Sequence, residues 1–238
     1  MTYLANIYKL GEYGKNNSIG AWVSEKYLWR KYFVNKNSLV LEIGCGHGRS
    51  TFDLAKLGFK KVYGIDLSEK LIERANKNKD KFDVNNIEFK IMSVTNMDFP
   101  NNYFEYCYNS YNTLDCVYPL KERINAIKEI YRVLKQDGIY IHSFHSVPAI
   151  NYGNKKNFII ESTLKTFKIL LNGGSGYIYD KNREYEYYST VKKEIKLFEK
   201  VGFKVIKIYS KNEIEKSKRY WKYLKSFDWF KFVIFKKG

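Results

Sequence analysis

Residues 38–48, Ser-Leu-Val-Leu-Glu-Ile-Gly-Cys-Gly-His-Gly, decide the fold of this 238-residue chain. The apolar run at the start of the stretch predicts a buried strand, and three glycines follow it at alternate positions, Gly44, Gly46 and Gly48. An amphipathic stretch comes next, so the order is typical of a strand, a tight loop and a helix. Glycines at such a loop let a ligand lie directly against the backbone.

A second apolar run ends in Asp66, eighteen residues after Gly48. An acid at the tip of the next parallel strand is well placed to bind the two hydroxyls of a ribose. The alternative is a tight connection without a ligand, because glycines also serve turns for backbone reasons alone. Three alternating glycines together with two nearby acids favour a nucleoside-containing cofactor.

Spacing narrows the choice of cofactor. The dinucleotide fingerprint would place its third glycine at position 49, where this chain has Arg49, and no G-x-x-x-x-G-K-[ST] phosphate loop is present. The stretch Glu42-x-Gly44-x-Gly46-x-Gly48 instead resembles the first motif of the class I S-adenosylmethionine (SAM)-dependent methyltransferases, in particular their small-molecule, type 11-like members. Further segments resemble later motifs of that family in the right order: 63–68, 98–106 and 127–138.

The resemblance implies a fold and a cofactor. The expected fold is an α/β, doubly wound, mostly parallel seven-stranded sheet of the Rossmann-like methyltransferase type, with helices on both faces and an antiparallel last strand. The expected cofactor is SAM, which leaves as S-adenosyl-L-homocysteine. We expect a single domain over residues 1–238, in which a helical segment at 1–35 and an inserted segment at 147–188 cover the substrate.

Hydrophobic patterning predicts the same alternation of strands and helices independently of the family. Gly58 and Gly138 stand where glycines commonly follow helices, and Ser68 is a suitable residue to begin one. The predicted strands are 38–44, 61–66, 87–92, 103–109, 139–145, 203–209 and 229–236, and the predicted helices are 49–57, 68–79, 120–135 and 190–201, with an amphipathic piece near 157–171.

By resemblance, the cofactor contacts divide among a few segments. Glu42 would act near the ammonium of SAM, Asp66 on the ribose and Leu67 on the adenine. Relatives usually place an aspartate near the adenine amine, whereas this chain has Ser93 and Val94 there. The full set of expected cofactor residues is Glu42, Gly44, Cys45, Gly46, Gly48, Asp66, Leu67, Ser93, Val94, Asn109 and Leu114, the last two near the transferred methyl group.

Candidate catalytic residues follow the predicted strands. A general base is needed only if the acceptor loses a proton as it attacks. His145, at the end of a predicted strand, is the best placed titratable group, with Tyr111 and Asp115 as further candidates. The alternative for His145 is a structural or partly exposed histidine. No grouping of histidines or carboxylates in the sequence suggests a metal site.

The acceptor is less clearly encoded. Residues 109–115, Asn-Ser-Tyr-Asn-Thr-Leu-Asp, lack the proline pair typical of family members that methylate amino groups of bases or glutamine. This favours a small-molecule acceptor, for example a sugar or a sugar-derived intermediate. An RNA methyltransferase is the alternative, and a non-catalytic SAM-binding protein is a second one. The sequence leaves the oligomeric state and the methylated element open.

Charge supplies the argument for RNA. The formal net charge is +17, and residues 151–238 carry 21 Lys and Arg against 9 Asp and Glu, with many tyrosines. Basic, aromatic surfaces can bind single-stranded nucleic acid, although the whole chain is rich in Lys, Asn, Ile and Tyr, which indicates a composition bias. No apolar run is long enough to span a bilayer, no signal peptide is evident, and three scattered cysteines argue against disulfides. We therefore expect a cytoplasmic protein without a membrane partner.

Overall fold

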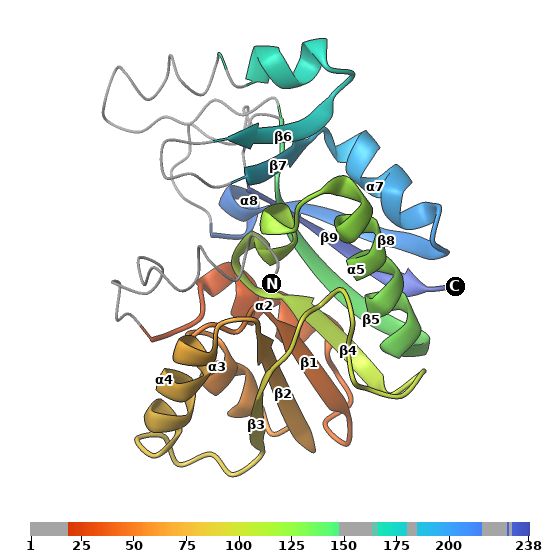
Figure 1. Cartoon of the computed structure of the whole chain (residues 1–238). Coiled ribbons are helices and arrows are strands. Elements are labelled where there is room, and N and C mark those ends of the chain that lie inside the picture. The colour runs from red at the N-terminus through yellow and green to blue at the C-terminus, as the bar shows by residue number, and fades with distance from the viewer. Residues whose placement is uncertain (1–18, 148–163, 165, 180–184, 216–227, 229) are drawn as a thin grey trace.

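The computed structural model describes residues 19–147, 164, 166–179, 185–215, 228 and 230–238 (Figure 1). The expected sheet is present. The strands of the large sheet are β1 (Leu39–Ile43), β2 (Lys61–Asp66), β3 (Ile87–Ile91), β4 (Phe104–Asn109), β5 (Leu134–His145), β8 (Phe203–Ser210) and β9 (Phe230–Lys237). The helices are α2 (Val23–Tyr32), α3 (Thr51–Ala55), α4 (Glu69–Lys79), α5 (Leu120–Val133), α7 (Val191–Glu199) and α8 (Lys211–Glu215), with the 3₁₀ turn η1 (Ser110–Cys116).

The sheet has the order β3-β2-β1-β4-β5-β9-β8. Strands β1 to β5 pair in parallel, whereas β9 pairs antiparallel with both β5 and β8. The predicted doubly wound seven-stranded sheet with an antiparallel last strand is therefore confirmed. In such a sheet the carboxyl ends of the parallel strands lie at one edge, which is where ligands bind.

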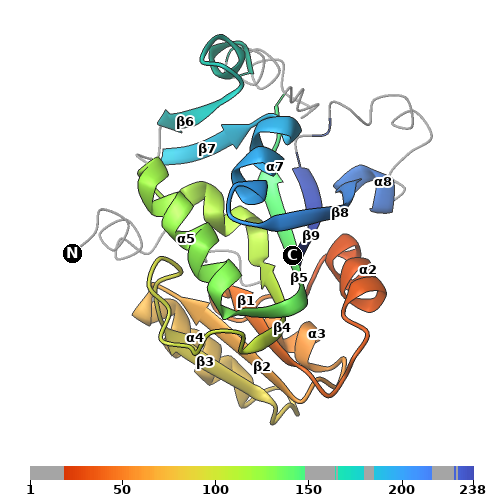
Figure 2. The ribbon, with the colours of Figure 1, turned by 90° about the vertical axis from the view of Figure 1, so that its right-hand side faces the viewer.

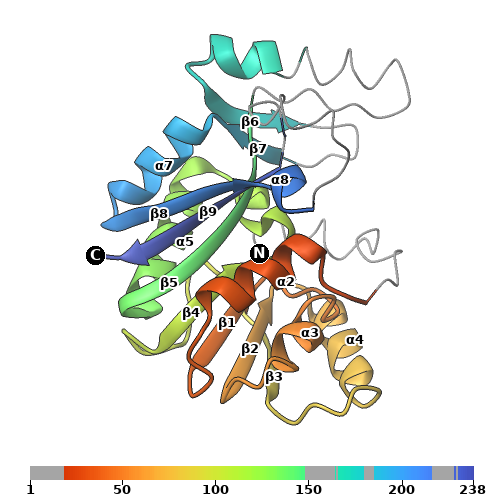
Figure 3. The ribbon, with the colours of Figure 1, turned by 180° about the vertical axis from the view of Figure 1, so that it is seen from behind.

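Two hydrophobic layers cover the sheet, one on each face. Helices α2, α3 and α4 contribute Trp29, Phe52 and Ile72 to one layer. Helices α5 and α7 contribute Ile127 and Phe198 to the other. Figure 1 shows α5 in front of the sheet, Figure 3 shows α2 in front of the opposite face, and Figure 2 views the layers from the side. The central strands β1 and β4 are buried at all but one position each, as expected of strands covered on both faces.

Element boundaries differ from the expectation at two places. Helix α3 begins at Thr51 rather than at 49, because the loop of three glycines continues through a turn up to Ser50. Strand β5 begins at Leu134, and α5 ends just before it, because Leu134 already pairs with Phe104 across an irregularity in the β4–β5 ladder. The role expected for Gly138 is wrong: it lies inside β5, and the positive φ of +62° belongs to Asp137.

The inserted segment forms a small sheet of its own. Strands β6 (Ser175–Tyr179) and β7 (Tyr185–Ser189) make an antiparallel hairpin, at the top of Figure 1. A bridge from Ser189 to Ser146 joins the hairpin to the end of β5. Residues 166–171 are helical, and the rest of the amphipathic piece predicted near 157–171 falls largely outside the described residues, as do residues 1–18 of the expected cover. Among the described helices, none has the length and hydropathy that crossing a membrane requires.

Candidate functional site

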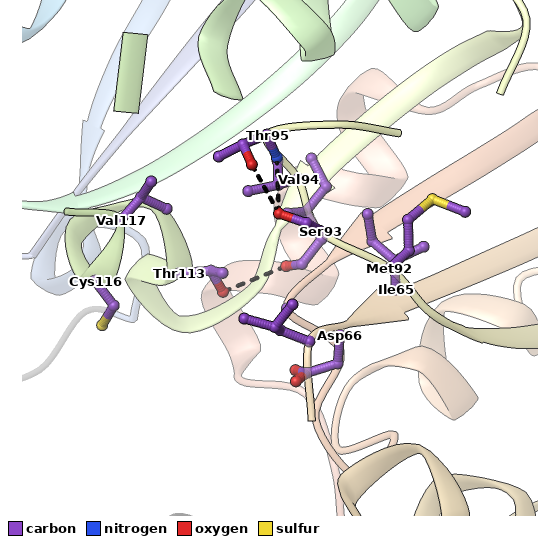
Figure 4. Close-up of a pocket in the computed structure, with 12 residues that line it drawn as sticks. Ile65, Asp66, Met92, Ser93, Val94, Thr95, Thr113, Cys116 and Val117 are labelled. Atoms are coloured by element: carbon purple, nitrogen blue, oxygen red, sulfur yellow. Dashed lines mark hydrogen bonds between the residues drawn. The ribbon is translucent and has the colours of Figure 1, made fainter. Parts of the chain in front are cut away.

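A pocket opens between the ends of β1, β2 and β3 and the later part of η1 (Figure 4). Its walls are largely apolar, and one carboxylate, that of Asp66, lies at its edge. Its lining residues are Ile43, Gly44, Ile65, Asp66, Leu67, Met92, Ser93, Val94, Thr95, Thr113, Cys116 and Val117. The pocket therefore lies at the carboxyl edge of the sheet, where the glycine loop and the acid at position 66 predict a ligand.

The glycine loop takes a conformation that only glycine adopts easily. Gly44, Gly46 and Gly48 have φ values of +69°, +55° and +85°. A Cβ atom on Gly44 would overlap Thr113, and one on Gly48 would overlap Phe52. A Cβ atom on Gly46 would meet no heavy atom of the described residues within 4 Å. Packing therefore explains two of the glycines, while Gly46 adjoins open space.

Asp66 ends β2 and joins the glycine loop to the start of α4. One carboxylate oxygen accepts from the amide of Gly46 at 2.9 Å, and the other accepts from the amide of Ser68 at 2.9 Å. Burial raises the pKa of Asp66, although these backbone bonds act in the opposite direction. The carboxylate is thus fixed beside the loop and remains on the pocket wall.

Glu42 is fully buried beneath the same loop. Its Oε1 accepts from the hydroxyl of Ser50, whereas Oε2 has no hydrogen-bond partner among the described residues. Burial raises the pKa of Glu42 to about 7, against the lowering influence of Ser50 and of the charge on Arg49. A buried carboxylate oxygen without a partner is costly, and a ligand, a water molecule or an ion beside it would supply the missing hydrogen bond.

The segment after β3 supplies another wall. Ser93 and Val94 line the pocket, as expected, together with Met92 and Thr95. The hydroxyl of Ser93 bonds to the hydroxyl of Thr95 at 2.8 Å and accepts from its amide at 3.2 Å. The Ser93 side chain therefore already has a partner within its own turn.

Other expected cofactor residues lie behind the pocket rather than on its wall. Asn109 and Leu114 are fully buried, and Cys45 is nearly so. The amide of Asn109 donates to the carbonyl of Ser143 at 3.0 Å and accepts from the hydroxyl of Tyr140 at 2.8 Å. These contacts fix the ends of β4 and β5 against each other.

The structure brings two of the three catalytic candidates together. His145 Nδ1 lies 3.1 Å from Asp115 Oδ2, and the same oxygen accepts from the His145 amide at 2.7 Å. His145 Nε2 lies 2.8 Å from the side-chain nitrogen of Asn112. Tyr111 is 54% exposed, with its ring centroid 5.1 Å from that of Trp22. Positive φ values at Tyr111 and Asn112 give η1 its sharp bend.

A buried ionic network stands behind Asp115. Arg123 is fully buried and pairs with Asp115 at 3.3 Å and with Glu194 of α7. Glu194 also contacts His142 Nε2 at 2.8 Å. Burial would raise the pKa of Glu194, but the charge of Arg123 and the bond from His142 lower it to about 2. The network ties α5, α7 and β5 to the turn that carries Asp115.

Sequence reasoning missed several pocket residues and one long-range contact. The pocket is also lined by Thr113 and Cys116 of η1 and by Val117, which follows it. These residues are close in sequence to the expected Leu114, and this closeness was the available signal. The ion pair between Glu25 and Arg49, at 2.5 Å, could not be predicted from the sequence, because the two residues lie in different predicted elements. In the part of the chain that the structure describes, no cluster of His, Cys, Asp and Glu could hold a metal ion.

Comparison with known proteins agrees with this geometry. Residues 40–138 match a family model described as a methyltransferase domain. The chain is 27% identical over 150 residues to EEF1A lysine methyltransferase 2 of Homo sapiens, covering 58% of this chain and 62% of that protein. It is 26% identical over 197 residues to the ubiquinone/menaquinone biosynthesis C-methyltransferase UbiE of Rickettsia bellii, covering 72% and 74%. The chain thus spans about three fifths of the human relative's length.

A solved structure shares the fold. It is a SAM-dependent methyltransferase from Methanosarcina mazei, with a TM-score of 0.68 and 22% sequence identity. The superposition covers 92% of this chain and 99% of that one. The superposition therefore extends well beyond residues 40–138.

Proposed function

We propose, from the premise that this chain belongs to the class I SAM-dependent methyltransferases, that it moves a methyl group from SAM to a small-molecule acceptor. The observation that carries the proposal is the pocket beside the glycine loop, with an acid at its edge and apolar walls. These features match the chemistry of SAM, which combines an adenine ring, a ribose and a charged amino acid.

The residues present fit that cofactor. Open space beside Gly46 leaves room for a ligand against the backbone, and the unpartnered Oε2 of Glu42 suits an ammonium group nearby. Asp66 suits the ribose hydroxyls, and Leu67 with Val94 suits the flat adenine ring. When bound, SAM supplies an electrophilic methyl group on a sulfonium, so the protein contributes mainly positioning and the exclusion of water.

The cover of the acceptor comes from two segments in this proposal, 1–35 and 147–188. Their described parts already contact the site. Helix α2 reaches the glycine loop through Glu25, and the hydroxyl of Tyr177 in β6 donates to the carbonyl of Val117 on the pocket wall. In Figure 1 the described strands β6 and β7 lie above the carboxyl end of β5, so an acceptor enclosed beneath them would be small.

His145 is the proposed general base for an acceptor that loses a proton. Asp115 Oδ2 lies 3.1 Å from its Nδ1 and accepts from its backbone amide, so Asp115 would orient the ring, and Arg123 pairs with the other oxygen of Asp115. Tyr111, exposed beside Trp22, would contact the acceptor rather than take its proton. This arrangement has the base and the orienting acid of many proton-transfer sites.

A quinone or another small ring is a reasonable acceptor class, since UbiE, by its name, methylates carbon in quinone synthesis. The human relative, by its name, methylates a protein lysine, so a protein acceptor is a competing outcome. RNA is a further candidate, favoured by the excess of 21 basic over 9 acidic residues in residues 151–238. A non-catalytic SAM-binding protein would bind the cofactor and methylate none of these acceptors.

Transfer of labelled methyl from SAM into a cell extract, with the purified protein added, tests the proposal. The extract is separated by size after treatment with ribonuclease, with protease or with neither. We expect label in the small-molecule fraction, unaffected by both enzymes. Label that ribonuclease releases would establish RNA as the acceptor, and label that protease releases would establish a protein. A variant with Asp66→Ala serves as the control for cofactor-dependent transfer.

A further inference from the structure

Glu25 is a buried carboxylate on the covering helix α2, and it is fully hydrogen-bonded. Its side chain is inaccessible to solvent. The two oxygens accept from the guanidinium of Arg49 at 2.5 and 3.0 Å, from the amide of Trp22 at 2.6 Å, and from the hydroxyl of Tyr108 in β4. Two donors on one guanidinium make the pair bidentate, which fixes orientation as well as distance.

Arg49 directly follows the glycine loop and joins three segments that are distant in the sequence. Besides Glu25, its guanidinium donates to the carbonyl of Gly20 at 3.0 Å and to the hydroxyl of Ser110 at 3.2 Å. Its own carbonyl accepts from the amide of Gly20 at 2.8 Å. The cover, the glycine loop and η1 therefore meet at one side chain, and the last two segments supply walls of the pocket.

The hydrogen bonds continue from Arg49 to the buried acid of the loop. The hydroxyl oxygens of Ser110 and Ser50 lie 3.0 Å apart, and the Ser50 hydroxyl donates to Oε1 of Glu42. The chain of contacts thus runs from α2, on the cover, to the carboxylate under the loop. A change in the position of α2 would therefore alter the hydrogen bonds that hold the glycine loop.

Stability alone gives a weak reason for this arrangement. The free energy needed to desolvate two charges is about as large as the free energy gained when they pair. Apolar residues can therefore often replace a buried ion pair without a loss of stability. A buried pair is better suited to hold segments in one particular register. Here the register is that of α2 against the glycine loop.

We propose that Glu25 is a positioning residue for cofactor binding, acting through Arg49 so that packing of α2 against the glycine loop and occupation of the pocket stabilise each other. The proposal rests on the proposed function, because it needs the pocket to hold SAM. By reciprocity, α2 should strengthen cofactor binding by the same factor by which the cofactor stabilises α2. Coupling between sites in proteins commonly amounts to about 5- to 150-fold in affinity.

A second acid, Asp53 of the neighbouring helix α3, also holds α2 and provides a matched control. Asp53 of α3 accepts from the amide of Ala21 at 2.8 Å and pairs with Lys26 at 2.8 Å. It therefore anchors the same covering segment without touching Arg49. Asp53→Asn removes contacts to α2 that do not involve Arg49, whereas Glu25→Gln weakens the contact between α2 and Arg49.

The experiment uses the whole 238-residue chain and measures its affinity for S-adenosylhomocysteine by calorimetry, together with hydrogen exchange of residues 20–32. Variants are Glu25→Gln, Arg49→Met, the double variant that combines these two substitutions, and Asp53→Asn, with thermal unfolding followed for each. In the wild type we expect the ligand to slow exchange of α2. Glu25→Gln should weaken binding by about 5- to 150-fold and abolish that slowing, while Asp53→Asn should leave the affinity unchanged.

The double variant addresses a purely structural role. If the pair acts as a unit, its two substitutions should be non-additive in ligand affinity, because either one already breaks the connection. Equal losses of affinity in Glu25→Gln and Asp53→Asn would overturn the proposal in favour of general destabilisation. Unchanged affinity in Glu25→Gln would overturn it as well. Failure of the wild type to bind would instead refute the proposed function on which it rests.

Discussion

Substitution of Gly46 by alanine separates the cost of backbone strain from the loss of a ligand site. Gly46 has a φ of +55°, and a Cβ atom there meets no heavy atom of the described residues within 4 Å. Gly58, after α3, has a φ of +81° and the same open surroundings. The two positions therefore impose the same kind of strain on alanine, but only Gly46 belongs to the loop beside the pocket.

The magnitudes can be worked from these values. A left-handed conformation costs a residue with a Cβ atom about 1–2 kcal/mol relative to glycine. For a chain of this size, each kcal/mol lowers the melting temperature by about 2–4 °C, so both variants should melt about 2–8 °C below the wild type. A methyl group forced against a bound ligand costs about 1–3 kcal/mol more, which corresponds to about 5- to 150-fold in affinity.

Calorimetric titration with S-adenosylhomocysteine, combined with thermal unfolding, measures both quantities. We expect Gly46→Ala to lose the affinity and Gly58→Ala to keep it, at similar losses of stability. Equal affinity in the two variants would refute the assignment of the open space beside Gly46 to the ligand. Overlap with Thr113 makes Gly44→Ala unsuitable for this purpose, since that variant would disturb the turn as well.

Three further predictions concern buried charges and the candidate base. The folded pKa of Glu42 is about 7 and its ordinary value is 4.5, so the free energy of unfolding of the wild type should fall by about 3 kcal/mol as pH rises from 4.5 to 7. Denaturant titrations of Glu42→Gln should lack this fall. An identical pH dependence in the two proteins would contradict the raised pKa. Because the pKa of Glu194 is lowered to about 2, its ionised form stabilises the fold above pH 4.5, and this stabilisation is lost as pH falls toward 2. Arg123→Met should lower the free energy of unfolding by about 3–5 kcal/mol at neutral pH. A decrease below 1 kcal/mol would exclude a buried ion pair. Once the acceptor is known, His145→Asn should lower kcat by about 10²- to 10⁴-fold with the SAM affinity unchanged, and an unchanged kcat would remove His145 as the base.

Local sequence patterns were sufficient for the core of the fold. The strand before the glycine loop and the loop itself are contiguous, and Asp66 ends the next strand along the chain, so local residue types were enough to identify all three. The antiparallel last strand followed from the resemblance to a family and could not have been read from periodicity. Gly138 shows the limit of local reasoning, because pairing of Leu134 with β4 decides where β5 begins.

Site residues were harder to place because side-chain direction depends on tertiary packing. A polar residue at the end of a strand indicates the ligand edge, yet the amide of Asn109 points into the sheet and binds Ser143. The contact between Glu25 and Arg49 joins residues 24 positions apart and depends on how α2 crosses the sheet. In the sequence, Glu25 is indistinguishable from an acid on a solvated helix face.

The most direct test of the whole account is the binding of S-adenosylhomocysteine to the wild-type protein and to Asp66→Ala. Asp66 lies on the pocket wall and is the residue proposed to bind the ribose. We predict saturable binding of one ligand per chain to the wild type, and a loss of affinity in Asp66→Ala while its circular dichroism stays unchanged. Absence of binding to the wild type, or equal affinity in the folded variant, would contradict the central claim that this pocket holds the methyl donor.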